Sequence, residues 1–228
     1  MSRKLIALAA LALGACSPGY SYRYRMTVEV DTPQGLKTGS SVWEVSVREG
    51  SGIPDSGLRA SERGSAVAVE LPTGTLYALM KRHDYVENQR GNYVTGVMAS
   101  YLNRVDYPGA TKDLAWPDDV KQIIRLKPVF EQDIDHYPLL VRFTDEKQPA
   151  TVQKVDPANL AASFGPGVSL KRITVTYTSD RPDVHALDER LPWISTTGML
   201  VPVPFSTPIR EGPFGSHITA SDFRENMK

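Results

Sequence analysis

The stretch RMTVEVDTPQGLKTGSSVWEVSV, residues 25–47, decides the fold of this chain. Apolar and polar side chains alternate over residues 26–31, which is the pattern of a strand with one buried face. A turn follows, because Pro33 presets the backbone of the second turn position and Gly35 closes it. A second strand is predicted over residues 36–47, so the whole stretch predicts an antiparallel hairpin.

Outside this hairpin, the chain alternates further strands with short helices. Runs of apolar and β-branched residues predict strands over residues 66–71, 75–80, 139–143, 151–155 and 168–178. Apolar side chains at helical spacing predict helices over residues 92–104, 117–127 and 156–165. The polar, Gly- and Ser-rich residues 49–63 predict a loop, and the strand over residues 75–80, apolar on both faces, should be covered on both. We therefore predict an α+β fold, a mainly antiparallel β-sheet with two or three packed helices, in a single domain.

Residues 156–167 form the most compact helix signal in the chain. Asp156 is expected to cap the helix, and Gly165 to take a left-handed position that ends it. Leu160 and Phe164 are four residues apart and are expected to bury one face. The FGPG sequence that follows lacks the order of a phosphate-binding loop, which runs from a strand into a helix. A structural role is therefore predicted for the segment.

The first sixteen residues, MSRKLIALAALALGAC, have the parts of an export signal. The apolar run over residues 5–13 is too short to cross a bilayer as a helix, which takes about 20 residues. The sequence Leu-Gly-Ala-Cys ending at Cys16 resembles the lipobox of bacterial lipoproteins, which implies cleavage before Cys16 and lipid on that residue. Two or more acyl chains give a stable membrane anchor. An ordinary secretory signal is the alternative, but Cys16 is the chain's one cysteine, which favours the lipobox.

These features predict four segments. They are a signal peptide over residues 1–15, a lipidated cysteine and tether over 16–24, a β-rich globular domain over 25–200, and a Pro-rich C-terminal extension over 201–228. Three alternating tyrosines, Tyr20, Tyr22 and Tyr24, could rest in the lipid interface. Their alternation instead favours a place for the last two in the first strand.

The mature chain has nearly balanced charge. Of 26 basic and 26 acidic residues, two basic ones lie in the signal, so the mature part is near −2 (24 against 26). It has no block of like charge, so no nucleic-acid surface is predicted. With Cys16 lipidated no cysteine is left for a disulfide, and a chain of about 210 residues can form a stable core without one.

Several stretches resemble an uncharacterised group of proteobacterial lipoproteins and hypothetical proteins. They are MTVEVDTPQG at residues 26–35, TGSS at 38–41, VDPANLAASFGPG at 155–167, LKRITV at 170–175 and RLPW at 190–193. The resemblance spans residues 25–194 and implies one folded unit. No activity is known for the group, so it implies no functional residues.

Two clusters of side chains are candidates for chemistry. Ser216 and His217 are adjacent in a Pro- and Gly-rich segment. Adjacent side chains rarely face each other and no G-x-S-x-G motif is present, so a solvated loop is favoured over a hydrolase site. The sequence DIDH at residues 133–136, with Glu131 nearby, has the ligand types of a zinc site. The four histidines lack zinc-enzyme spacing, so an exposed acidic loop is favoured there.

The favoured function is non-catalytic. No cofactor or metal is predicted, and Trp43, Trp116 and Trp193 are expected in the core rather than on a ligand platform. We expect an envelope lipoprotein, held to the membrane by the lipid on Cys16, that binds or scaffolds another envelope protein. Ser17, where a retention signal would have aspartate, predicts the outer membrane, facing the periplasm. The alternative is a periplasmic hydrolase with catalytic residues that no motif reveals; a deep pocket with paired titratable groups would favour it, and an exposed sheet edge would favour binding.

Overall fold

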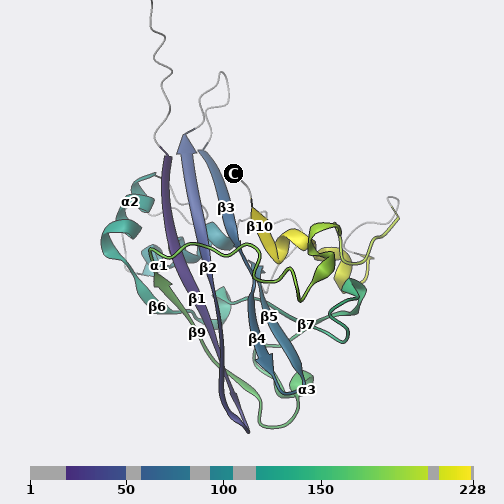
Figure 1. The fold of residues 1–228 in the computed structure, drawn as a ribbon. Helices are drawn as coiled ribbons and strands as arrows, with labels where there is room; N and C mark the ends of the chain where they lie inside the picture. The colour runs from purple at the N-terminus through teal and green to yellow at the C-terminus, as the bar shows by residue number, and fades with distance from the viewer. Residues whose placement is uncertain (1–18, 50–57, 83–92, 105–116, 205–210, 227–228) are drawn as a thin grey trace, which may run out of the picture.

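Two antiparallel β-sheets with short helices around them form the protein, as the computed structural model shows (Figure 1). The structure describes residues 19–49, 58–82, 93–104, 117–204 and 211–226. Within them, the first sheet runs in the order β10 (Arg224–Asn226), β3 (Leu58–Ser65), β2 (Gly35–Glu49), β1 (Gly19–Thr32), β9 (Ser169–Tyr177) and β6 (Val129–Glu131). The second runs β4 (Val67–Leu71), β5 (Gly74–Arg82), β7 (Pro138–Phe143) and β8 (Val152–Lys154). The α-helices are α1 (Tyr93–Arg104), α2 (Pro117–Leu126) and α3 (Ala161–Phe164), so the mainly antiparallel fold class is confirmed.

The β1–β2 hairpin forms as predicted. Thr32 pairs with Gly35 across the turn, and the register continues without a break to Gly19 opposite Arg48. Alternate side chains of β1 are fully buried and face the second sheet and the helices; they are Tyr22, Tyr24, Met26, Val28 and Val30. The period of two therefore translates directly into one buried face.

The start of β1 corrects the expected tether. The strand begins at Gly19, so residues 19–24 belong to the sheet. Tyr22 and Tyr24 are both fully buried, which confirms the strand alternative for these two tyrosines. Their rings lie 6.3 Å apart, and the ring of Tyr24 contacts Trp43 of β2 edge to face. Aromatic packing of this kind holds them in the core rather than at a lipid surface.

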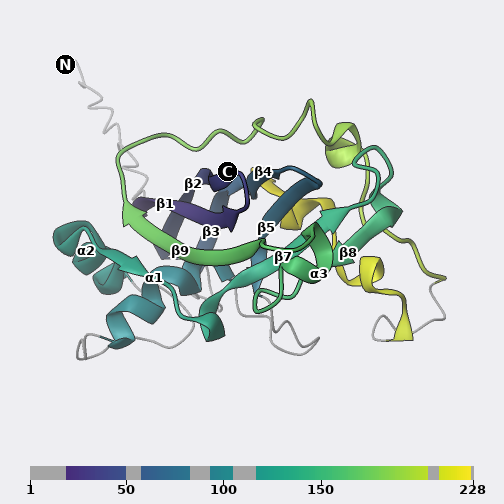
Figure 2. The same cartoon turned by 90° about the horizontal axis from the view of Figure 1, so that it is seen from below.

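The second sheet is covered on both faces, as the apolar β5 predicted. Leu76 and Ala78 pack with the first sheet, α1 and α2, whereas Tyr77 and Leu79 pack with residues 187–223 (Figure 2). The sheet therefore separates two hydrophobic clusters and contributes side chains to both.

Residues 211–226 are part of this packing and not an extension. Ile218, Ala220 and Phe223 are buried against the second sheet, and β10 pairs with β3. The apolar residues of this segment are few and follow 3-10 turns, whose spacing matches neither a strand nor an α-helix. Their spacing therefore predicted no helix or strand, although they cover part of one face of the sheet.

The predicted loop over residues 49–63 is wrong from Leu58 onward, where β3 begins. Its sequence, LRASERGS, is mostly polar, and the buried Glu62 occupies a position on the inner face. Backbone pairing with β2 and β10 makes this segment a strand without an apolar pattern.

The helix predicted over residues 156–165 is much shorter. α3 covers Ala161–Phe164, and Asp156 accepts a hydrogen bond from the backbone N–H of Ala158 at 2.9 Å, closing a turn instead of capping the helix. Aspartate side chains often compete with helices in this way. Leu160 and Phe164 are buried, and Gly165 has the positive φ (+99°) that was expected. The helices predicted over residues 92–104 and 117–127 are confirmed as α1 and α2.

Residues 178–186 cross the outer face of the first sheet after β9 (Figure 2). Arg25 of β1 forms an ion pair with Asp180 at 2.6 Å, and the Ser65 hydroxyl donates to the carbonyl of Asp183 at 3.0 Å. Val184 is buried beneath this crossing. The crossing brings residues 186–190 next to β4, where the candidate site lies.

Candidate functional site

β2 and β4 lie against each other without a β-ladder between them. β2 pairs with β3 only over residues 44–49, and β4 pairs with β5 alone in the described sheets. The two strands meet at Gly39, where a Cβ atom would lie 2.0 Å from the carbonyl oxygen of Ala68. A side chain cannot fit at that distance, so the contact requires glycine. Residues 41–43 of β2 lie against Gly64 and Ser65 at the end of β3. Residues 35–38 of β2, and β4 on the side away from β5, therefore each have a strand edge that pairs with no described strand.

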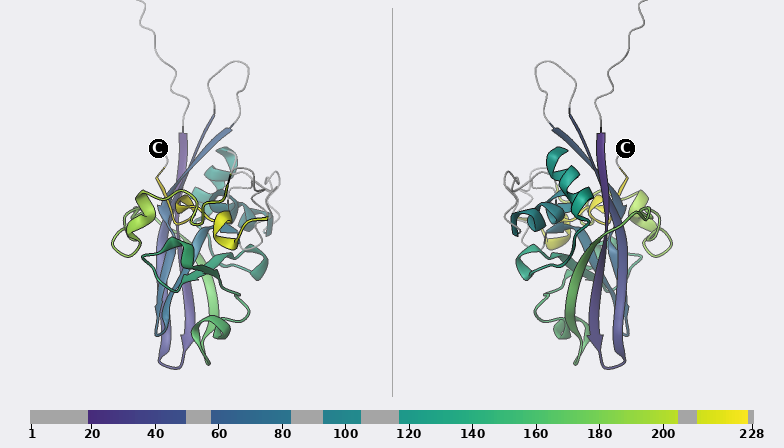
Figure 3. Two further views of the ribbon diagram at one scale, coloured as in Figure 1. Left: turned by 90° about the vertical axis from the view of Figure 1, so that its right-hand side faces the viewer. Right: turned by 90° about the vertical axis from the view of Figure 1, so that its left-hand side faces the viewer.

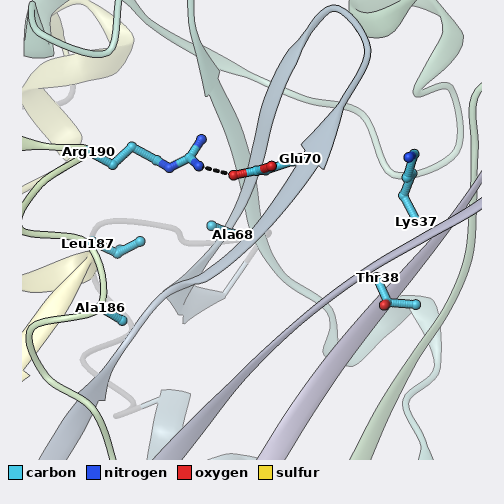
Figure 4. A pocket seen from close by; sticks show the side chains of 7 residues that line it. All are labelled: Lys37, Thr38, Ala68, Glu70, Ala186, Leu187 and Arg190. Carbon is cyan, nitrogen blue, oxygen red and sulfur yellow. Dashed lines mark hydrogen bonds and ion pairs between the residues drawn. The ribbon is translucent and has the colours of Figure 1, made fainter.

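A pocket of about 410 Å³ lies beside this contact (Figure 4). Its lining comes from three segments: Lys37 and Thr38 of β2, Ala68 and Glu70 of β4, and Ala186, Leu187 and Arg190 after the crossing. Thr38 adjoins Gly39, so the Gly39–Ala68 contact forms one end of the pocket. We call this pocket and its two strand edges the β2–β4 groove.

Arg190 is the centre of a charge network on one wall of the groove. Its Nη2 forms an ion pair with Glu70, and its Nη1 donates to the Thr75 hydroxyl at 2.7 Å. The same Nη1 lies 3.6 Å from Oε1 of Glu146, which also accepts the Tyr77 hydroxyl at 2.7 Å. Burial and this hydrogen bond raise the pKa of Tyr77, so its hydroxyl stays protonated. The network holds the guanidinium in place and pairs its charge with two carboxylates.

Lys37 lies across the groove from this network (Figure 4). Its side chain is half-buried and has no hydrogen bond or ion pair with the described part of the chain. The neighbouring Thr38 is exposed and offers a hydroxyl. Because Glu70 and Glu146 both lie beside Arg190, neither carboxylate is paired with the ammonium of Lys37.

The β1–β2 turn and the start of β1 lie at opposite ends of the first sheet (Figure 3). Lys37, which lines the groove, is close to the turn, whereas Arg48 pairs with Gly19 at the other end of the hairpin. At about 3.3 Å per strand residue, Lys37 and Arg48 are about 36 Å apart. The start of β1 and the Lys37 side of the groove are therefore far apart along the first sheet.

The predicted solvated loop at Ser216 and His217 is wrong for the serine, which is buried under the second sheet. Its hydroxyl donates to the carbonyl of Pro213 at 2.8 Å, and the carbonyl of His217 accepts from Lys81 at 2.8 Å. The serine hydroxyl thus serves a 3-10 turn. The pair carries no nucleophile beside a base.

The DIDH segment forms a single 3-10 turn with exposed side chains, which confirms its expected exposure. Asp133 and His136 are joined by an ion pair between Oδ1 and Nδ1. Across the described residues, no group of three or more His, Cys, Asp or Glu side chains is placed to hold a metal ion.

The predicted tryptophans and the FGPG turn can be placed in the structure where they are described. Trp43 and Trp193 are buried, as expected. Gly167 of the FGPG sequence has φ +79°, and a Cβ there would lie 2.9 Å from Cγ of Pro33, so this turn packs on the β1–β2 turn. Cys16 and Trp116 lie outside the described residues.

Glu62 is a titratable group that sequence patterns did not indicate. It is buried at the start of α1, where Oε1 accepts the backbone N–H of Thr95 at 3.2 Å. The hydroxyl of Tyr24 donates to the carbonyl of Val94 in the same turn at 2.9 Å. Burial raises the pKa of Glu62 to about 8, and the charge of Glu225 adds to the rise, while the Thr95 hydrogen bond opposes it. This carboxyl serves the helix and takes no part in the groove.

Sequence reasoning missed the groove because its residues are far apart in the chain. Lys37, Glu70 and Arg190 belong to no motif and meet only through the crossing after β9.

Comparison with protein families, with curated proteins and with solved structures finds no match to this chain. Within the described residues, no helix combines the length and apolar character that crossing a membrane takes. The interpretation of the groove therefore follows from its own geometry and charge.

Proposed function

We propose that this chain is a lipid-anchored protein of the bacterial envelope, one folded unit, that binds an envelope protein through the β2–β4 groove. Lipid on Cys16 holds it to the outer membrane, on the periplasmic side. Only two residues lie between Cys16 and Gly19, the first residue of β1. At about 3.5 Å per extended residue, that end of the sheet starts within about 10 Å of the anchor.

The observation that carries the proposal is the place of the groove. An anchor before Gly19 puts the β1–β2 turn, at the opposite end of the hairpin (Figure 3), farthest from the bilayer, and Lys37 and Thr38 of the groove are close to that turn. A site about 36 Å along the sheet, by strand length, is presented to partners in the periplasm. Two uncovered strand edges beside a pocket are also a common arrangement for peptide recognition.

The chemistry of the lining supports binding over hydrolysis. The pocket offers a free ammonium, an exposed hydroxyl and an arginine–glutamate pair, beside apolar side chains. None of these lining residues is a serine, cysteine or histidine, and the Thr38 hydroxyl has no hydrogen-bonded base. Few polar groups on a partly apolar wall are typical of a binding site.

Site-specific photo-cross-linking in intact cells tests this proposal. A photo-reactive benzoylphenylalanine would replace Thr38, and a matched variant would carry it at Gln153, an exposed position on β8. We expect the lipidated protein to cross-link one defined envelope protein from position 38 and not from position 153. Equal products from both positions, or none from position 38, would contradict binding at the groove.

A further inference from the structure

We propose that the β2–β4 groove receives the carboxyl-terminal end of an extended polypeptide, with the terminal carboxylate at Lys37. This inference rests on the proposed function, since it names the occupant of the same groove.

The shape of the groove favours a chain end over a passing chain. The Gly39–Ala68 contact closes one end, because the two backbones touch there and leave no room for a third strand. A chain that runs along the groove toward this contact has to stop. A volume of about 410 Å³ has room for the last few residues of a polypeptide.

The strand edges favour an extended conformation. Residues 35–38 of β2, before the Gly39–Ala68 contact, pair with β1 only, and β4 pairs with β5 only in the described sheets. An uncovered strand edge presents backbone donors and acceptors that an added extended segment can satisfy. The occupant therefore gains backbone hydrogen bonds that do not depend on its sequence.

The charge of the groove favours a single anionic group. The charge of Arg190 is paired with Glu70 and Glu146. Lys37 is half-buried and has no acidic partner among the described residues, and an ammonium in that position gains from a carboxylate that it can reach. A terminal carboxylate supplies that one charge, whereas an amide does not.

The apolar part of the lining predicts which side chain the groove prefers at the last residues of the occupant. Ala68, Ala186 and Leu187 form the apolar part of the lining. A small or medium apolar side chain at the last or next-to-last position of the occupant would pack against them.

Binding of the lipidated full-length chain, in detergent, to a peptide array tests the inference. The array would hold octapeptides attached through their N-termini, each as a free carboxylate and as the matching C-terminal amide. We expect retained peptides to bind about tenfold more tightly as carboxylates than as amides, a difference that corresponds to one charge-assisted contact. Lys37→Gln should remove most of that preference and Lys37→Arg should keep it. Lys154→Gln, which removes an exposed charge from β8, should behave like wild type.

Three results would overturn the inference. Equal binding of carboxylates and amides would mean that the groove takes the interior of a chain. Competition by acetate or propionate as strong as by a retained free peptide would mean that a small carboxylate is the ligand. If no peptide binds while position 38 still cross-links to a partner, this inference fails and the proposed function stands; loss of both signals would remove the proposed function as well.

Discussion

Gly39 shows how one residue fixes the arrangement of the two sheets. The carbonyl of Ala68 occupies the space of a missing Cβ, so the closest approach of β2 and β4 depends on the absence of a side chain. Gly96, in α1, has nothing within 4 Å of the equivalent position. A side chain is therefore excluded at Gly39, whereas there is room for one at Gly96.

Gly39→Ala should therefore destabilise the protein by about 1–3 kcal/mol, because the strands must separate to admit a methyl group. Gly96→Ala is the matched control and should stabilise it by about 0.5–1 kcal/mol, since alanine favours the helix. Thermal unfolding of a soluble form that starts at Ser17 measures both. An unchanged melting temperature for Gly39→Ala would mean that the β2–β4 contact is looser than described.

Because Glu62 is buried in the core, the stability of the fold is expected to depend on pH. Burial raises the pKa of this carboxyl from its ordinary 4.5 to about 8, so the folded chain binds a proton there that the unfolded chain releases. Stability from this group is fully present below pH 4.5 and is lost as the pH rises to about 8. The loss is on the order of a few kcal/mol, because each pKa unit corresponds to about 1.4 kcal/mol.

Glu62→Gln removes the titration while an amide oxygen can still accept the Thr95 N–H. The variant should gain stability over wild type progressively between pH 4.5 and 8, and by a constant amount above pH 8. Urea unfolding at a series of pH values gives this difference directly. Parallel curves for the two proteins across the whole range would show that Glu62 titrates normally in the folded state.

At the level of elements, the sequence predicted those segments whose side chains alternate or repeat clearly. The β1–β2 and β4–β5 hairpins, β9, α1 and α2 all have such patterns, and the structure confirms them. β3 was missed because its strand character comes from backbone pairing on both sides, and its mostly polar sequence has no alternating pattern. Residues 211–226 were missed because 3-10 turns give buried residues no regular spacing.

α3 is only one turn long but makes several contacts with the second sheet. Four residues of helix carry Phe164, whose ring is buried with the guanidinium of Arg142 5.1 Å from its centre. Thr73 of the β4–β5 turn donates to the Phe164 carbonyl at 2.8 Å, and Arg142 also donates to the carbonyl of Ser163. The short helix thus joins the β4–β5 turn to β7 of the second sheet.

Phe164→Ala should cost about 3–5 kcal/mol, because it leaves a cavity where these contacts meet. Asp156→Ala removes only a local turn hydrogen bond and should cost about 0.5–1.5 kcal/mol. Leu126→Ala, at a position that is 43% exposed, should change the stability by less than about 0.5 kcal/mol. Melting temperatures rank the three variants; a Phe164→Ala variant that melts like wild type and fails to cross-link a partner would make this segment a recognition loop.

On the scale of the whole molecule, the groove exists only because distant segments converge. Lys37 and Arg190 are brought together by the crossing of residues 178–186, whose path no local pattern specifies. The cellular location expected from the sequence and the groove found in the structure are therefore different kinds of inference. The first depends on sixteen contiguous residues, and the second on the assembled fold.

The proposed location in the outer membrane depends on lipid attachment to Cys16. In a bacterial cell, labelled palmitate should enter the wild-type protein and should not enter Cys16→Ser, because that serine offers no thiol for the lipid. The wild-type protein should also collect in outer-membrane fractions, since Ser17 is not the retention aspartate. Label in the variant would contradict lipidation at Cys16, and recovery only in inner membranes would contradict the sorting.

The proposed orientation on the membrane can be tested at two positions on β2. With Cys16 lipidated, a single introduced cysteine is the one free thiol, so a fluorophore can be placed at either end of the sheet. Arg48 is exposed opposite Gly19, and Leu36 is 48% exposed beside the turn, about 40 Å further along the strand at about 3.3 Å per residue. In vesicles with an acceptor on the lipid headgroups, energy transfer should be strong from Arg48→Cys and weak from Leu36→Cys. Equal transfer from both positions would mean that the sheet lies flat on the membrane, and the groove would then face the bilayer surface instead of the periplasm.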